Sequence, residues 1–207
     1  MTSTEHHLAE RFRRQVAGSI QAKQALLEDL GPCLAVTDVL IDCYRNGGSL
    51  FVFGNGGSAA DAQHIAAEFL GRFYLERPAL PAHALTVNTS ALTAISNDYS
   101  FEMVFARQLE ALGRAGDVAI GISTSGNAGN VLAGLRAARA RDMVTVALTG
   151  AGGGRAREEA EHWVGVPADD TPRIQECHIL IGHIWSELVE DALFGDGRMV
   201  ASAQQPQ

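Results

Sequence analysis

Residues 53–68 read FGNGGSAADAQHIAAE, and they continue directly from the apolar run SLFVF at 49–53. The run is short, aromatic and β-branched, which is typical of an interior strand of a parallel sheet. The glycines that come next let the backbone turn sharply and approach a ligand without a Cβ in the way. Ser58 stands where a helix should begin, and the unpaired N–H groups and positive dipole of a helix start attract anions. This stretch therefore predicts strand, glycine turn and helix, with a phosphate at the turn.

The glycine turn differs from the common nucleotide-binding loops. It has no Lys after the glycines, as a Walker loop requires, and it does not fit the pattern G-x-G-x-x-G. A tight strand-to-helix connection that binds nothing is an equally open interpretation of the glycines alone.

The predicted helix after the turn carries three polar residues on one face. Asp61, His64 and Glu68 are spaced i, i+3 and i+7, and His64 and Glu68 are i, i+4 neighbours. The last two could chelate a metal ion, or Glu68 could act as a general base. The alternative is a solvated His–Glu pair, but the apolar residues around them predict a largely buried carboxylate and imidazole, which need a partner or a chemical role.

A second strand-to-turn junction is rich in hydroxyl groups. The apolar run at 118–122 ends in Ser123-Thr124-Ser125-Gly126-Asn127, and a helix is predicted to start near Asn127. Side-chain hydroxyls and backbone amides can converge on phosphate oxygens without any Arg or Lys. Helix capping needs only one such hydroxyl, so the excess favours a ligand.

Strands and helices alternate through the middle of the chain. Further strands are predicted at 82–87, 143–148 and 162–166, and helices at 5–30, 33–45, 91–95, 101–112, 155–160 and 171–194. This pattern predicts an α/β fold, a doubly wound parallel sheet of five strands with an N-terminal helical extension. In such a sheet, ligands bind at the carboxyl ends of the strands, where both polar turns fall.

Several segments carry more specific expectations. Gly31-Pro32 should end the first helix, whose apolar face we expect to lie against another subunit. Residues 96–99 should form a buried break between two helices, lining a polyhydroxylated ligand or serving as an ordinary Asx-type cap. The last helix should bury six apolar side chains, namely Ile174, Cys177, Ile181, Ile184, Trp185 and Leu188.

Composition narrows the class of protein. Of the 207 residues, 46% are hydrophobic and 19% charged, as in an ordinary globular domain, and the net charge of -8 argues against nucleic acid as a partner. There is no signal-peptide pattern and no apolar run long enough for a membrane, so a cytoplasmic protein is expected. Cys33, Cys43 and Cys177 lack C-x-x-C spacing and are expected to be reduced core thiols.

The motifs together resemble those of phosphoheptose isomerases, which belong to the sugar isomerase (SIS) domain superfamily. The similarity rests on the motifs at 54–68, 97–99, 123–127 and 173–176 together with His183. The resemblance implies a flavodoxin-like SIS fold, a homotetramer, one zinc ion per site, and conversion of sedoheptulose 7-phosphate into D-glycero-D-manno-heptose 7-phosphate. A noncatalytic SIS protein that binds a sugar phosphate, or that associates with a replication initiator, is the alternative.

The resemblance also implies roles for individual residues. The metal ligands would be His64, Glu68, Gln175 and His183, and the catalytic groups would be Glu68 and His183. The substrate would be bound by Asn55, Gly56, Gly57, Ser58, Glu68, Asn97, Asp98, Ser123, Thr124, Ser125 and Gln175. Two positions depart from the family pattern: Ala128 stands where Ser is common, and Pro172 where some members have Asp.

Domain limits and assembly follow from these assignments. We expect N-terminal helices over 1–46, the SIS domain over 47–197 and a flexible tail over 198–207. Gln175 and His183 are eight residues apart, about 12 Å along a helix, whereas zinc ligands lie only ~2 Å from the metal. Two copies of the helix from different subunits would remove the strain, which predicts active sites at subunit interfaces.

Overall fold

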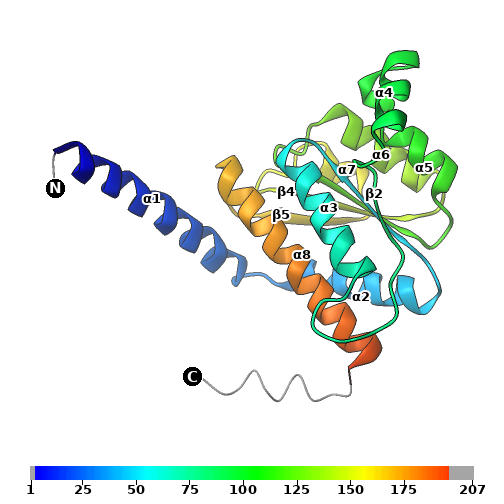
Figure 1. Ribbon diagram of the computed structural model, residues 1–207, viewed down its shortest axis with the longest axis horizontal. Coiled ribbons are helices and arrows are strands. Elements are labelled where there is room, and N and C mark those ends of the chain that lie inside the picture. Colours follow the sequence, from blue (N-terminus) through cyan, green and yellow to red (C-terminus); the bar gives the residue numbers. More distant parts are fainter. Residues whose placement is uncertain (1–2, 196–207) are drawn as a thin grey trace.

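The structure is a computed structural model that describes residues 3–195. Five parallel strands form one sheet in the order β2-β1-β3-β4-β5, which confirms the predicted doubly wound α/β fold (Figure 1). The strands are β1 (Leu50–Gly54), β2 (Ala82–Ala84), β3 (Val118–Ser123), β4 (Val144–Gly150) and β5 (His162–Val166). The helices are α1 (Ser3–Leu26), α2 (Gly31–Arg45), α3 (Gly57–Leu70), α4 (Thr89–Asp98), α5 (Ala106–Leu112), α6 (Gly129–Arg139), α7 (Ala156–Glu159) and α8 (Thr171–Phe194), with a 3₁₀ turn η1 (Phe101–Met103).

The sheet is buried on both faces, and its strands send alternate side chains to two hydrophobic cores. Leu50 and Val52 of β1 belong to the core shared with α2, α3 and α8. Phe51 and Phe53 belong to the core shared with α5 and α6 on the opposite face. Figure 1 shows α3 and α8 side by side along one face of the sheet, while α1 projects away from the body. This arrangement places α3 and α8, which carry the predicted metal ligands, next to each other.

Two predicted helix limits near the N-terminus were wrong. The first helix ends at Leu26 rather than Leu30, and Gly31-Pro32 opens α2 instead of closing α1. Proline is suited to the first turn of a helix, because its missing N–H would have no intrahelical partner there and its φ is already helical.

The region between β2 and β3 also differs from the prediction. The strand predicted at 82–87 is only three residues long, and α4 runs to Asp98 rather than residue 95. The helix predicted at 101–112 is a 3₁₀ turn at Phe101–Met103 followed by α5. Residues 97–99 are exposed, so the expected buried break is wrong. The Asn88 side chain accepts a hydrogen bond from the Ala91 N–H and caps the start of α4.

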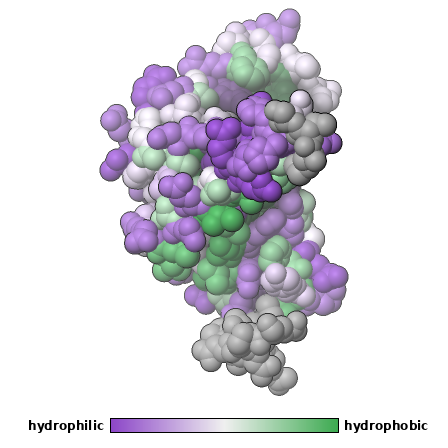
Figure 2. Space-filling model, turned by 90° about the vertical axis from the view of Figure 1, so that its left-hand side faces the viewer, coloured by the Kyte–Doolittle hydropathy of each residue, from purple (hydrophilic) through white to green (hydrophobic). Residues whose placement is uncertain are grey.

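Four of the six predicted core positions of α8 are buried, but Ile184 and Leu188 are 42% and 37% exposed. Both line an apolar groove of about 290 Å³ between α8 and the junction of α1 with α2. On α1, four large apolar side chains are exposed: Leu8, Phe12, Val16 and Ile20. Figure 2 shows hydrophobic residues gathered on the side from which α1 projects. The chain therefore leaves much of its N-terminal apolar surface uncovered.

The remaining predictions concern the domain boundaries, the cysteine thiols and membrane-spanning helices. The predicted boundary at 46/47 falls in the turn before β1 and stays a prediction, while the predicted tail at 198–207 lies outside the described residues. All three cysteines are free; Cys43 and Cys177 are buried and Cys33 is half-buried. Among residues 3–195, no helix combines the length and apolar character needed to cross a membrane.

Candidate active site

The loop between β1 and α3 is shaped by glycine. Gly56, the N-cap of α3, has φ +55°, a conformation that glycine adopts without strain. A Cβ on Gly54 would lie 2.8 Å from Ser58 Cβ, and Ser58 is buried against it at the helix start. Gly57 leaves room for the Gln175 side chain, whose amide fills the place of a Cβ. The glycines thus let neighbouring groups approach the backbone of the loop closely, while Ser58 packs inward.

In the loop between β3 and α6, the three predicted hydroxyl side chains differ in their exposure to solvent. Ser123 is buried, Thr124 half-buried and Ser125 exposed, and the Ser125 hydroxyl accepts a hydrogen bond from the Asn127 N–H (3.2 Å). Gly126 has φ +66° and packs on the turn at 150–154, where any Cβ would collide with the Gly153 carbonyl. The helix starts at Gly129, two residues later than expected.

A reciprocal amide pair joins the two loops. Asn55 Nδ2 donates to Asn130 Oδ1 (2.7 Å), and Asn130 Nδ2 donates back to Asn55 Oδ1 (2.8 Å). Asn130 is buried, and nothing in the sequence singled it out because its partner is 75 residues away. The pair fixes the spacing of two loops that the sequence had predicted separately.

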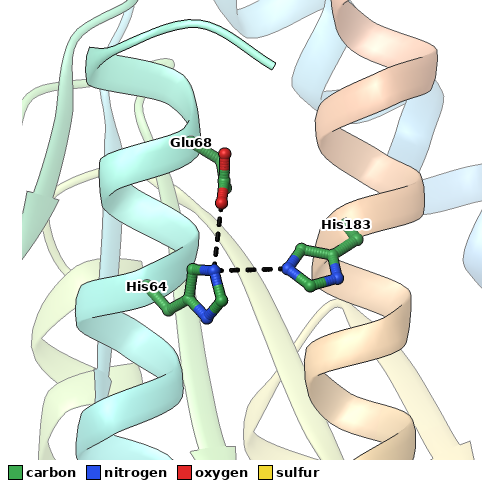
Figure 3. Close-up of side chains that lie close together, drawn as sticks. All are labelled: His64, Glu68 and His183. Atoms are coloured by element: carbon green, nitrogen blue, oxygen red, sulfur yellow. Dashed lines mark hydrogen bonds and ion pairs between the residues drawn. The ribbon is translucent and has the colours of Figure 1, made fainter. Parts of the chain in front are cut away.

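Three metal-ligating side chains converge where α3 meets α8 (Figure 3). His64 Nε2 lies 3.0 Å from Glu68 Oε1 and 3.3 Å from His183 Nε2, and one ligand atom from each residue falls within 4.8 Å of the others. His64 and Glu68 meet because they are i, i+4 neighbours, as predicted. His183 joins them because α8 runs very close to α3: a Cβ on Gly182 would lie 2.5 Å from Ile65 Cγ1.

This donor set fits zinc. Two imidazole nitrogens and one carboxylate oxygen are the ligands of many catalytic zinc sites, which keep a further position open for water or substrate. The three donors already face one another, and a cation between them would relieve the contact of the two Nε2 atoms, of which at most one can donate to the other. Together they can hold a divalent metal ion at the surface of the chain.

The His64–Glu68 pair is more open than the sequence indicated. The two side chains are 49% and 23% exposed, so the expectation of a largely buried pair is wrong. Helix α3 buries Ile65, Ala66 and Phe69 in the core, and the helical period then leaves the His64–Glu68 edge at the molecular surface.

Asp61 lies one turn before His64 and is half-buried. Burial raises the pKa of Asp61 to about 6, and nearby His64 opposes that rise. Its Oδ2 atom is buried and has no hydrogen-bond partner among the described residues. The third polar residue of the predicted face is therefore a half-buried carboxyl whose pKa lies above its ordinary value.

The structure does not bring all predicted site residues together within one chain. The Gln175 amide lies against Gly57, which is two turns, or about 10 Å, before His64 in α3. Asn97 donates to Asp98 Oδ1 (2.8 Å) at the exposed end of α4, so these two side chains contact each other rather than the cluster. The roles predicted for Gln175, Asn97 and Asp98 stay predictions.

His178, another histidine of α8, is a core residue and does not belong to the metal-ligand cluster. It is fully buried, and its Nε2 lies 3.1 Å from the Thr149 carbonyl. Burial lowers the pKa of His178 to about 4 against the opposing effect of that hydrogen bond, so the ring is neutral. It supports the end of β4, as a core residue does.

The sheet places the loops after β1 and β3 together at its carboxyl edge, which is where doubly wound α/β domains bind their ligands. The SIS domain model matches residues 11–150, and the chain belongs to the SIS domain family. It is 52% identical over 181 residues to a phosphoheptose isomerase of Roseiflexus sp. (strain RS-1), covering 87% of this chain and 92% of the relative. It is 49% identical to a phosphoheptose isomerase of Aneurinibacillus thermoaerophilus, covering 88% of this chain and 94% of the relative.

Solved structures agree with the sequence relatives. The phosphoheptose isomerase GmhA from Neisseria gonorrhoeae superposes with a TM-score of 0.84 at 46% identity, covering 89% of this chain and 99% of that one. A phosphoheptose isomerase from Francisella tularensis gives 0.85 at 36% identity, covering 92% and 100%. Within the SIS family, the chain is therefore a member of the phosphoheptose isomerases, and it is an enzyme that isomerises a sugar phosphate.

Proposed function

We propose that this enzyme converts sedoheptulose 7-phosphate into D-glycero-D-manno-heptose 7-phosphate at the His64–Glu68–His183 cluster. The convergence of these three side chains from α3 and α8 is the observation that carries the proposal. The similar phosphoheptose isomerases supply the substrate class. The loops after β1 and β3 would bind the phosphate and the hydroxyl groups of the sugar.

The reaction moves a proton between C1 and C2 through an enediol. Glu68 would take the proton from C1 and return it to C2, while His183 would move a proton between O1 and O2 through its Nδ1, because its Nε2 faces the cluster. A carboxylate has two oxygens, so Glu68 can bind a metal through one and accept a proton with the other. A zinc ion held by His64, Glu68 and His183, with Gln175 as the fourth ligand, would polarise the carbonyl.

The assay is direct. Incubation with sedoheptulose 7-phosphate should yield the aldose, and a chelator should abolish the conversion until zinc is restored. In the control, the protein is treated with the same chelator and dialysed, and an equal amount of Mg²⁺ is then added in place of zinc. Mg²⁺ prefers oxygen ligands and should not restore activity. Substrate binding without conversion in the zinc-loaded protein would instead support a noncatalytic sugar-phosphate-binding protein.

We also propose that the enzyme is a homotetramer with active sites between subunits, acting in the cytoplasm. The exposed apolar face of α1 and the neighbouring groove between α1, α2 and α8 support the assembly, because such surface is usually covered by a partner. The cytoplasm would keep the free thiols of Cys33, Cys43 and Cys177 reduced.

Ala128 offers a test of the phosphate position. It is the N-cap of α6 and makes no side-chain capping bond. If phosphate lies at this helix start, Ala128→Ser should tighten substrate binding by at most ~1.5–3 kcal/mol, the value of one hydrogen bond to a charged group. A serine there could also cap the helix, which would raise the melting temperature of the ligand-free protein. Titration calorimetry and thermal unfolding separate the effects: a higher melting temperature with unchanged affinity would place the phosphate elsewhere.

A further inference from the structure

An ion pair between Arg77 and Glu190 lies wholly inside the chain, next to the metal-binding cluster. Arg77 Nε is 2.8 Å from Glu190 Oε1, and the two side chains are 1% and 0% exposed. Burying two charges costs several kcal/mol per ion unless their remaining hydrogen-bonding atoms are also satisfied. Each partner here makes further hydrogen bonds, and these lead to the candidate active site.

Glu190 holds the loop that follows α3. Its Oε1 accepts the Phe73 N–H (2.9 Å), and its Oε2 accepts the N–H groups of Tyr74 (2.6 Å) and Leu75 (2.8 Å). Burial alone would raise the pKa of Glu190, but these N–H groups and Arg77 lower it more, so that it lies below its ordinary value. The carboxylate therefore stays charged and keeps three consecutive amides in place.

Arg77 holds the end of α3 itself. Its Nη2 donates to the Glu68 carbonyl (2.9 Å), and its Nη1 donates to the carbonyls of Phe69 (2.9 Å), Gly71 (3.3 Å) and Pro78 (3.0 Å). The last carbonyls of a helix have no intrahelical partner, and a buried guanidinium satisfies several of them at once. Arg77 thus binds the backbone of the residue whose carboxylate faces His64.

The same loop contacts the ligand on α8. The Phe73 ring lies 5.9 Å from the His183 ring, centroid to centroid. Glu190 is seven residues after His183, which is two turns further on the same face of α8. The ion pair therefore connects the Glu68 backbone, the loop that packs on His183 and the helix that carries His183.

We propose that Arg77 and Glu190 are positioning residues that hold Glu68 of α3 and His183 of α8 at the spacing needed to bind the metal ion. This inference rests on the proposed function only for its kinetic consequence. Its structural part concerns the geometry of the His64–Glu68–His183 cluster and can be tested without substrate.

Glu190→Gln is the primary variant. The amide keeps one acceptor oxygen but turns an NH₂ group toward N–H donors, so the loop should lose its anchor. At a temperature where circular dichroism shows both proteins folded, zinc affinity measured against a chromophoric chelator should fall about 10- to 100-fold, the usual range for residues that orient metal ligands. Amide exchange should become faster at 73–75 and at 66–70, and kcat should fall more than KM rises.

Two further variants complete the experiment. Glu159→Gln removes a carboxylate from an Arg136 ion pair at the surface, also with a short N–O distance (2.9 Å), and should change none of these quantities. If Glu190→Gln does not fold, the double variant Arg77→Met/Glu190→Leu replaces the pair with apolar side chains, a change that is often neutral for stability. It should weaken zinc binding in the same way.

The outcomes separate the inference from the proposed function. Wild-type zinc affinity and kcat in a folded Glu190→Gln or double variant, even with a lower melting temperature, would overturn the positioning role. A wild-type protein that binds zinc but does not isomerise the heptose would refute the proposed function, while the zinc and exchange measurements would still decide the inference. A wild-type protein that binds no zinc would overturn the metal-positioning role, whatever the amide exchange at 66–70 shows.

Discussion

Glu68→Gln should lose nearly all turnover while still binding the sugar phosphate. A positioned general base typically contributes ~10²–10⁴-fold to rate, and a neutral amide cannot take the proton from C1. Glutamine has nearly the size of glutamate, and the Glu68 side chain is 23% exposed, so the substitution introduces no bulk into the core. The measurement is kcat by product analysis, together with calorimetric binding of sedoheptulose 7-phosphate.

Metal content must be measured in the same samples, because Glu68 is also a proposed zinc ligand. The matched control is Glu110→Gln, which makes the same chemical change in the exposed Arg107 ion pair on α5. A Glu68→Gln protein that contains zinc and turns over near the wild-type rate would remove Glu68 from the mechanism. If Glu68→Gln loses metal and activity to the same extent, Glu68 acts as a metal ligand and not as the general base.

Mixing two inactive variants should restore activity if sites are shared between subunits. His64, Glu68 and His183 meet within one chain, whereas that chain's own Gln175 lies against Gly57, about 10 Å away along α3. We therefore expect His183→Ala and Gln175→Ala to be inactive separately. In mixed oligomers, a site can take the three-residue cluster from one subunit and Gln175 from the other, so about a quarter of the sites should be intact after random exchange.

The mixing experiment needs proof that subunits have exchanged. Native mass spectrometry of differently tagged variants shows whether mixed oligomers form, and mixing two preparations of His183→Ala is the control without complementation. Mixed oligomers that stay inactive would show that all ligands come from one chain, which would then have to move Gln175 away from Gly57.

The fold was predictable because its determinants are local and repeated. Each interior strand is a short apolar run, and each polar turn stands at the end of such a run. Alternation alone therefore predicted the parallel sheet and the edge at which the polar turns lie. The errors arose where local signals compete. Gly31-Pro32 is compatible with ending one helix or starting the next, and only the path of α1 into α2 shows which applies.

The candidate site was predictable in part. That His64 and Glu68 would meet follows from the helical period, which is a property of any α-helix whatever surrounds it. Their exposure was mispredicted, since the sequence shows apolar neighbours but not which of them face the core. Ile184 and Leu188 were misassigned for the same reason. Asn130 carried no signal, because the residue it pairs with is remote in sequence.

The sequence by itself determined the α/β class, the two polar turns at strand ends and the side chains available for metal chemistry, because these depend on the order and spacing of residues along one chain. Only the tertiary structure decided that His183 Nε2 lies 3.3 Å from His64 Nε2, that Gly182 lets α8 approach Ile65, and that Arg77 and Glu190 tie the two helices together. The distance and register between two packed helices depend on how their side chains fit across the contact, and that fit is encoded in no single segment.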